Sequence, residues 1–249
     1  LPRSSWPSAS EMIKEISVGE IAAKDYRKVE VFKKYGIDFC CGGKKSLSKV
    51  RSEKGISQEQ LEKELHQAEI STKLPSQDFN TWDLNFLADY IIQTHHKYVV
   101  QAMAPIFEYT QKVARVHGHQ HPEVIEAASL FVKVMDELNQ HMMKEEQVLF
   151  PYIKKLAESK KTGQVIQSPF GTVANPVSMM EDEHEMVGLL MNEIRKITNN
   201  YTVPEDACNS FRYSYAKLQE FENDLHQHIH LENNILFPKA IEMELAMNN

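Results

Sequence analysis

HMMKEEQVLFP at residues 141–151 and HIHLENNILFP at residues 228–238 are two copies of one motif. The copies align without gaps and share a His, a Glu four residues later and a closing Leu-Phe-Pro, so five of eleven positions are identical. Residues four apart lie on the same face of a helix, with Cβ atoms about 5–6 Å apart. Each copy therefore predicts a helix that presents an imidazole and a carboxylate together.

A further His precedes each copy at a matching distance. His96 lies 45 residues before His141, and His184 lies 44 residues before His228. Glycine is scarce, with 9 in 249 residues, and the intervening segments are rich in Glu, Lys, Leu, Ala and Met, which favour helix. The sequence thus predicts two helix hairpins, and their short connections are typical of an antiparallel four-helix bundle with an internal two-fold pseudo-repeat. The predicted long helices are 80–116, 122–159, 173–199 and 204–247.

The region before the bundle predicts a separate, smaller all-α domain. Short helices are expected at 18–35, 46–53 and 57–69. The resulting domain assignment is a Ser- and Pro-rich leader at 1–11, a small helical domain at 12–72, a linker at 73–79 and the bundle at 80–249.

The repeat predicts a metal centre inside the bundle. Four imidazoles and two carboxylates suit a pair of transition-metal ions with each Glu as a bridge, and a set without thiolate favours two iron ions, with manganese or zinc less favoured. His95 remains an alternative to His96. His226 and His230 point about 200° away from His228 around the helix and are expected to be solvated. The predicted ligands are His96, His141, Glu145, His184, His228 and Glu232.

The three cysteines indicate a reducing compartment rather than a disulfide framework. Cys40 and Cys41 are adjacent and precede two glycines, which leave the thiols approachable. We therefore interpret them as candidate redox or iron-transfer thiols, the alternative being two small buried residues. Cys208 has no such context and is expected to be a packing residue.

Charge and hydropathy exclude other classes of protein. The net charge of −7 argues against nucleic-acid binding. The sequence has no run of about 18 apolar residues, so no membrane-spanning helix is expected. Without an apparent signal peptide, a cytoplasmic location is expected.

Four segments carry a resemblance to a known family. DFCCGGK at 38–44, HMMKEEQ at 141–147, MEDEH at 180–184 and the 228–238 motif resemble the repair-of-iron-centres proteins, also called RIC, YtfE or ScdA, which have a hemerythrin-like di-iron domain. The resemblance implies the same six iron ligands, and His117 matches a further family histidine near the site. It also implies a small helical N-terminal domain with the cysteine pair.

The resemblance implies the repair of iron–sulfur clusters damaged by nitrosative or oxidative stress, by iron donation or by handling nitric oxide. The expected partners are damaged iron–sulfur proteins and small diatomic ligands such as nitric oxide or oxygen, with a possible homodimer. The alternatives are a hemerythrin-like protein that binds or senses oxygen or nitric oxide, and a nitric oxide or peroxide reductase. Whether the chain is an enzyme is left open.

Overall fold

The computed structural model describes residues 16–71, 78–164 and 166–247, and their regular structure is helical. Within these ranges the β pairing consists of an isolated bridge between Ser17 and Ser46. The all-α prediction is confirmed. The predicted leader at 1–11 and most of the predicted linker at 73–79 lie outside the described residues.

The chain divides into two compact units. One contains the residues up to Trp82 together with His230–Pro238, and the other contains Asp83–Ile229 together with Lys239–Asn249. The first boundary lies close to the predicted end of the linker. The assignment of His230–Pro238 to the first unit is a feature that the sequence pattern did not indicate.

Short helices build the first unit. Ser17 begins α2 with a capping box, because its hydroxyl accepts the Glu20 N–H while the Glu20 carboxylate accepts the Ser17 N–H. The region predicted as one helix over 18–35 is interrupted at Asp25, whose carboxylate binds the backbone N–H and the guanidinium of Arg27. The described helices of this unit up to Trp82 are α2 (Val18–Lys24), η1 (Tyr26–Lys28), α3 (Val29–Lys34), α4 (Leu47–Lys54), α5 (Gln58–Ser71) and η2 (Phe79–Thr81).

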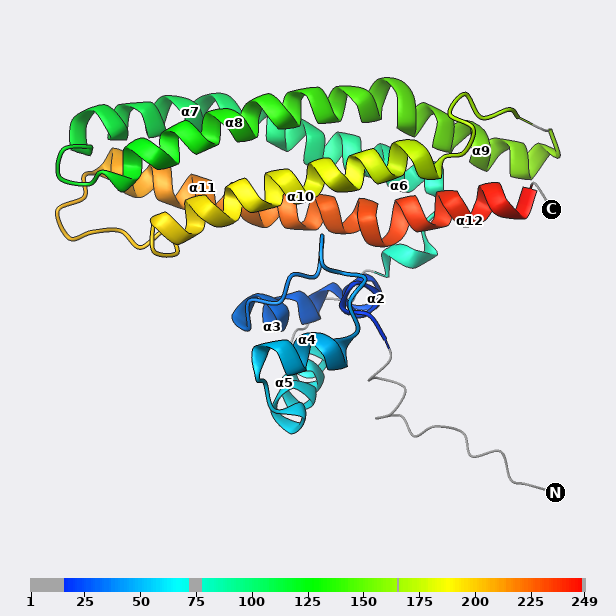
Figure 1. Cartoon of the computed structure of the whole chain (residues 1–249), viewed down its shortest axis with the longest axis horizontal. Helices are drawn as coiled ribbons and strands as arrows, with labels where there is room; N and C mark the ends of the chain where they lie inside the picture. Colours follow the sequence, from blue (N-terminus) through cyan, green and yellow to red (C-terminus); the bar gives the residue numbers. More distant parts are fainter. Residues whose placement is uncertain (1–15, 72–77, 165, 248–249) are drawn as a thin grey trace. The chain divides into compact units, whose positions relative to one another are not determined.

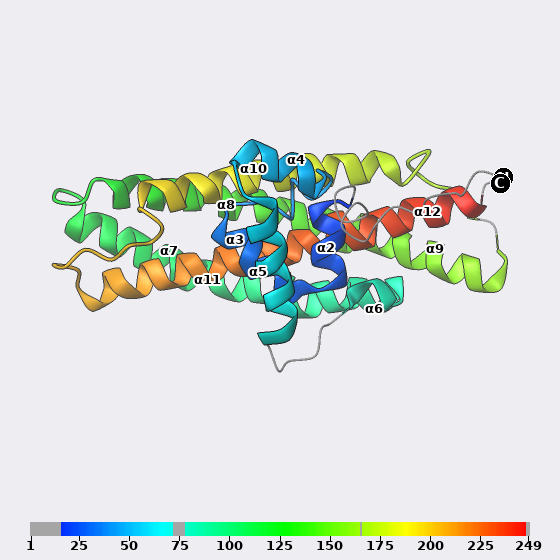
Figure 2. The same ribbon diagram turned by 90° about the horizontal axis from the view of Figure 1, so that it is seen from below.

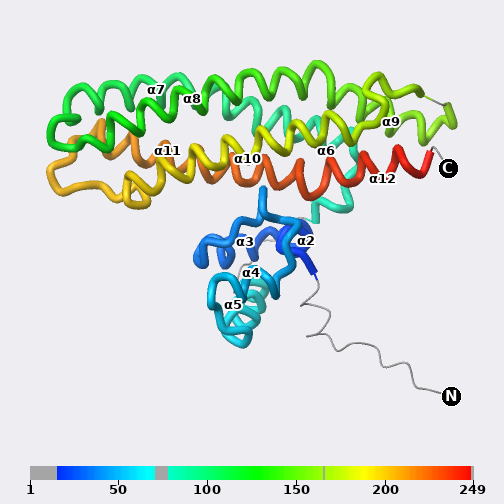
Figure 3. Tube along the Cα trace, in the orientation of Figure 1, coloured from blue at the N-terminus to red at the C-terminus, as the bar shows by residue number. Residues whose placement is uncertain are grey.

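Long helices build the second unit. Figures 1 and 2 show α7, α8, α10 and α11 side by side along a common axis, with successive helices running in opposite directions. The Cα trace of Figure 3 shows α6 leading into α7, α8 into α9 and α11 into α12. These helices are α6 (Leu84–Tyr90), α7 (Lys97–His117), α8 (Glu123–Lys144), α9 (Phe150–Thr162), α10 (Ala174–Ile197), α11 (Asn209–Leu231) and α12 (Phe237–Met247). The predicted antiparallel four-helix bundle is confirmed.

Aromatic side chains fill the interior of this bundle. Phe131 and Phe221 are fully buried and pack edge to face, with ring centroids 5.4 Å apart. Phe211 and Tyr215 form a second edge-to-face pair at 4.8 Å. Burial of a Phe side chain stabilises a fold by about 1.5–3 kcal/mol, so these pairs hold the helices in fixed register.

In the described part of the chain, three π-helical turns interrupt the long helices, and each of them includes a predicted metal ligand. Such turns close with a hydrogen bond to the residue five positions earlier, as from Phe150 N–H to Glu145 O and from Phe237 N–H to Glu232 O. Proline lacks an N–H and its ring collides with the carbonyl four residues earlier, so the Leu-Phe-Pro ends of both motifs explain two of these turns. The turns are η3 (Ile91–His96), η4 (Glu145–Leu149) and η5 (Glu232–Leu236).

Candidate metal centre

The structure brings the six predicted ligands together in two groups of four. Each of the six side chains is at most 2% exposed, and His228, Glu145 and Glu232 are fully buried. Within each group, one donor atom from every residue lies within 4.8 Å of the others. The groups are His96, Glu145, His228 and Glu232, and then His141, Glu145, His184 and Glu232.

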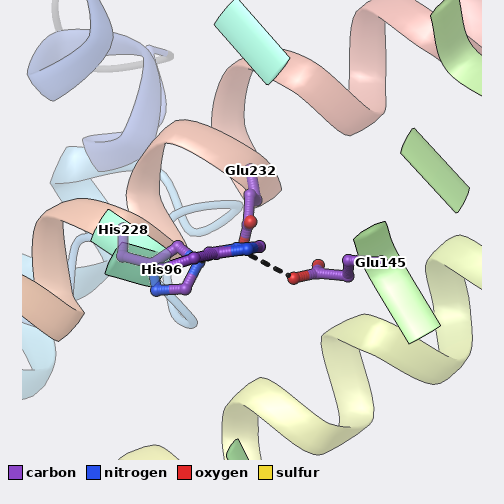
Figure 4. A group of neighbouring side chains, drawn as sticks. All are labelled: His96, Glu145, His228 and Glu232. Atoms are coloured by element: carbon purple, nitrogen blue, oxygen red, sulfur yellow. Dashed lines mark hydrogen bonds and ion pairs between the residues drawn. The ribbon is translucent and has the colours of Figure 1, made fainter. Parts of the chain in front are cut away.

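The first group joins η3, η4, α11 and η5. His96 Nε2 lies 3.1 Å from His228 Nε2 and 3.4 Å from Glu145 Oε2. Figure 4 shows both imidazoles and both carboxylates directed toward the same point. Glu232 follows His228 by four residues on a continuous helical run, which places its carboxylate beside the same point.

The second group repeats this arrangement with residues of α8 and α10. His141 Nε2 lies 2.8 Å from His184 Nε2 and 3.2 Å from Glu145 Oε1. The two oxygens of Glu145 therefore divide between the groups, with Oε2 next to His96 and Oε1 next to His141. Such a carboxylate is placed to bridge two ions.

The spacing of these atoms fits metal ligands. Two donors that bind one ion at about 2.0–2.2 Å lie roughly 2.8–3.6 Å apart in octahedral or tetrahedral geometry. The donor pairs of the two groups are 2.8–3.4 Å apart. Nitrogen and oxygen donors without sulfur are typical of iron and manganese sites. The residues present thus fit a metal centre of this class.

Two further carboxylates, which the sequence analysis missed, contact the outer nitrogens of the ligand histidines. Glu146 Oε1 lies 2.8 Å from His96 Nδ1, and Glu183 Oε2 lies 2.9 Å from His141 Nδ1. We call these two residues the outer carboxylates. A carboxylate that accepts from Nδ1–H fixes the tautomer and turns Nε2 toward the metal. The sequence signal that could have identified them is their position next to predicted ligands, since Glu146 follows Glu145 and Glu183 precedes His184.

The outer carboxylate on His141 is held in its charged form. The hydrogen bond with His141 is the main cause of the lowered pKa of Glu183, and Lys144 lowers that pKa further against the opposing effect of burial. An ionised Glu183 accepts the His141 Nδ1–H and increases the basicity of the imidazole.

His95 lies beside the first group without belonging to it. Its Nδ1 is 3.0 Å from Asp224 Oδ1, and its ring stacks on His228 with centroids 5.7 Å apart. Of the two adjacent histidines, the groups described above contain His96.

The expectation that His226 and His230 are solvated is wrong for His230. This side chain is fully buried within the first unit, where its ring centroid lies 5.7 Å from those of Tyr26 and Phe39. Burial lowers the pKa of His230 to about 4, so the imidazole is neutral and Nδ1 accepts a hydrogen bond from Asn234 at 2.9 Å. His226 is partly exposed and lies 4.0 Å from Glu222.

His117 and Cys208 lie together at one end of the bundle. His117 Nε2 is 3.2 Å from Cys208 Sγ, and Cys208 is exposed rather than packed in the core, which corrects the packing assignment. His117 ends α7, 21 residues after His96, which corresponds to about 30 Å along a helix. The structure therefore does not bring His117 to the metal groups.

The two remaining predicted residues, Cys40 and Cys41, form a third group of donors with Asp38 in the first unit. Both thiols are free, Cys40 is buried and Cys41 is half-buried. The pKa of Cys40 is raised by its hydrogen bond with Cys41, by burial and by the nearby negative charge of Asp38.

Comparison with known proteins places this arrangement in a family. The model of the hemerythrin HHE cation-binding domain matches residues 87–240, which include all six residues of the two groups. The chain belongs to the YtfE family of hemerythrin-domain proteins. A second model, the ScdA_N domain of unknown function, matches residues 14–69.

The relatives match over nearly their whole length. The iron-sulfur cluster repair protein YtfE of Musicola paradisiaca is 36% identical over 233 residues, 93% of this chain and 98% of that protein. Proteins of the same name from Yersinia pestis and Yersinia pseudotuberculosis are 34% identical over 228 residues, covering 92% of this chain and 97% of theirs. Hemerythrin-type domains imply a metal site, which agrees with the buried His and Glu groups. Among the described helices, none has the length and hydropathy needed to cross a membrane.

Proposed function

We propose that this chain is a di-iron protein that repairs iron–sulfur clusters damaged by nitrosative or oxidative stress. The observation that carries the proposal is the pair of buried donor groups that share Glu145 and Glu232. The name of the YtfE relatives, and their coverage over nearly the full length, support the choice of iron and of repair.

The residues of the two groups would each have a defined task. His96 and His228 would hold one iron ion, and His141 and His184 would hold the other, with the two glutamates between them. When bound, the ions supply redox chemistry and a source of ferrous iron. The complete burial of Glu145 and Glu232 keeps both carboxylates away from water, so their charge is directed at the ions.

Iron donation is the form of repair that the donor set favours. Neutral imidazoles and two shared carboxylates hold ferrous iron less tightly than a cage of thiolates, because no soft anionic sulfur is present. Each group offers four residues, fewer than the six positions of an octahedral ion, so positions remain for a diatomic ligand. Nitric oxide or oxygen binding, or the reduction of nitric oxide or peroxide, is the alternative function at the same centre.

The deciding experiment uses an iron–sulfur enzyme inactivated by nitric oxide. The iron-loaded chain and a reductant are expected to restore activity faster than an equal concentration of ferrous salt. The matched control is the double variant Glu145→Ala and Glu232→Ala, which removes both shared carboxylates. Recovery at the rate of ferrous salt alone, or equal recovery with the double variant, would refute the proposal.

The cysteine pair is proposed to serve repair rather than iron storage. Thiolates bind ferrous iron and attack nitrosyl groups, whereas the His and Glu groups contain no sulfur. The double variant Cys40→Ser and Cys41→Ser is expected to keep the iron of its His and Glu groups and to repair more slowly. An unchanged repair rate would return the pair to a packing role.

We also propose partners and a cellular location for the chain. Damaged iron–sulfur proteins would be transient partners, as the name of the relatives suggests. Sedimentation of the purified chain tests the predicted homodimer, and cell fractionation tests the predicted cytoplasmic location.

A further inference from the structure

A second set of donors lies outside the His and Glu groups, in the turn that follows α3. Asp38, Cys40 and Cys41 offer one oxygen and two sulfur atoms, all within 4.8 Å of one another. This spacing is close to that of ligands that share one ion, since a zinc-type ion binds sulfur at about 2.3 Å and oxygen at about 2.0–2.2 Å.

The backbone of the turn is built around the Asp38 carboxylate. Its Oδ1 accepts hydrogen bonds from the backbone N–H of Cys40 and of Cys41, both at 3.0 Å, and lies 3.2 Å from Cys40 Sγ. A Cβ on Gly42 would lie 2.9 Å from the Asp38 carbonyl oxygen, which is too close for any side chain. The glycine thus permits the tight turn that brings both sulfurs to the carboxylate.

Asn234, which belongs to the same compact unit, holds the turn by a further hydrogen bond. Its Nδ2 donates to the carbonyl oxygen of Phe39 at 3.0 Å. A Cβ on Gly43 would lie 2.3 Å from Asn234 Oδ1 and 2.6 Å from Phe39 O, so Gly43 is needed for this close approach. The turn is therefore held from both sides, and its three donors are fixed before any ion arrives.

We propose that Asp38, Cys40 and Cys41 form a thiolate-type metal site that binds one thiophilic divalent ion. Three protein donors leave at least one position of a four-coordinate ion open, which is typical of exchange or catalytic sites rather than closed structural ones. Cys41 is half-buried and Asp38 is exposed, so that position is reachable from solvent. The existence of this site follows from the turn alone, whereas its use for ferrous iron rests on the proposed function.

Binding at this site has a defined proton balance. In the turn, the Cys40 thiol donates a hydrogen bond to Asp38 Oδ1 at 3.2 Å. An incoming ion forms an S–metal bond at each of Cys40 and Cys41 and displaces the proton of each thiol to water, with no change in oxidation state. Affinity is consequently expected to increase as the pH rises.

The test uses the full-length chain with its His and Glu groups first saturated with iron, under anaerobic conditions. Cd²⁺ is titrated, and the ultraviolet sulfur-to-metal charge-transfer band is recorded, because the His and Glu groups contain no sulfur and give no such band. The expected result is one Cd²⁺ per chain, with protons released to the solvent as the ion binds. Mn²⁺, which prefers oxygen donors, is expected to give no band.

Variants assign the ligands. Cys40→Ser and Cys41→Ser are each expected to abolish the one-per-chain band. Asp38→Asn retains an oxygen that accepts the two backbone N–H bonds, so the turn is preserved while the charge is lost. Loss of an outer partner of a metal ligand lowers affinity about 10–100-fold, so loss of a direct ligand is expected to weaken Cd²⁺ binding by at least about tenfold. Cys208→Ser is the matched control and should bind Cd²⁺ as the parent does.

Three outcomes would overturn the site. These are an undiminished band in the double variant Cys40→Ser and Cys41→Ser, a band that disappears with Cys208→Ser, and unchanged affinity in Asp38→Asn. Circular dichroism of each variant shows whether the chain is folded. If a serine variant unfolds, the parent chain is alkylated with and without Cd²⁺ instead. Bound Cd²⁺ is expected to protect Cys40 and Cys41 from alkylation. Equal reactivity of both thiols with and without Cd²⁺ would refute the site. None of these results depends on cluster repair, so failure of the site and failure of the proposed function are distinguishable.

Discussion

Replacing the outer carboxylate Glu183 by Gln is expected to weaken the binding of one of the two proposed ions selectively. Glu183 Oε2 lies 2.9 Å from His141 Nδ1, its side chain is 20% exposed, and the contact with His141 lowers the pKa of its carboxyl. Loss of such a partner lowers metal affinity by about 10–100-fold, which corresponds to about 1.4–2.7 kcal/mol. The ion held by His141 and His184 should bear this loss.

The second outer carboxylate supplies an internal comparison. Glu146 contacts His96 Nδ1 at 2.8 Å, but its side chain is 43% exposed, so water screens its charge more strongly. The change Glu146→Gln is therefore expected to lower metal affinity about tenfold, the lower end of the same range. The affected ion would be the one held by His96 and His228. Glu185→Gln is the matched control, because Glu185 follows His184 on the same helix, is exposed and makes the same change in net charge.

The assay is competition for iron by a chelator under anaerobic conditions, with the iron that remains on the chain counted at each chelator concentration. In the Glu183→Gln variant, one ion per chain should leave at a chelator concentration about 10–100-fold lower than in the parent, while the other ion stays. An equal loss in Glu185→Gln would show that net charge alone is responsible. Simultaneous loss of both ions would show that the outer carboxylates do not act on separate groups.

Three further predictions concern the shared carboxylate, the core and the pH dependence. Glu145→Ala should release both ions, because its oxygens contact both groups, whereas His226→Ala should keep both, as metal analysis would show. Phe131→Ala should lower the free energy of unfolding by about 3–5 kcal/mol in denaturant titrations, since the ring is fully buried. Burial opposes ionisation of Asp25, yet hydrogen bonds from Arg27 outweigh it and lower the pKa of that carboxyl. Its stabilising effect is present above the unfolded-state pKa of about 3.9 and is lost as the pH falls; metal-free Asp25→Asn should therefore lose less stability than the parent between pH 5 and pH 2.

The helices were predictable because apolar spacing and terminators act locally. The expected helix at 173–199 agrees closely with α10 (Ala174–Ile197), and the predicted end of the first helical region coincides with Gly36, which adopts φ +60°. The break at Asp25 was not predictable from spacing, because a side-chain bond to the Arg27 backbone competes with the helix there. Periodicity records which face is apolar and gives no sign of such competition.

The π-helical turns were missed for a related reason. A turn that closes one residue later shifts the helix face by a single position, and an apolar pattern of period 3.6 tolerates that shift. Pro151 and Pro238 each follow a π-helical turn that begins at a shared carboxylate, Glu145 or Glu232. The repeat of Leu-Phe-Pro is thus tied to the placement of the ligands as well as to packing.

The repeat revealed the metal ligands, which both halves share, but it gave no sign of the outer carboxylates, which are not repeated. Glu146 aligns with Asn233, and Glu183 aligns with His95, so neither outer carboxylate is duplicated. The structure nevertheless distributes them evenly, with Glu146 on a histidine of the first group and Glu183 on a histidine of the second. Each ion would therefore have one carboxylate-backed imidazole, although the two halves of the sequence differ.

This even distribution does not make the two groups equivalent. Glu183 is the less exposed of the outer carboxylates and is itself paired with Lys144, whereas Glu146 is 43% exposed. A charge close to water orients its histidine less firmly, because solvent competes for the same hydrogen bond. The group of His96 and His228 is accordingly expected to release its ion first. In a protein that donates iron, that order would leave the second ion, with the two shared carboxylates around it, to keep the buried centre from collapsing while the first is transferred.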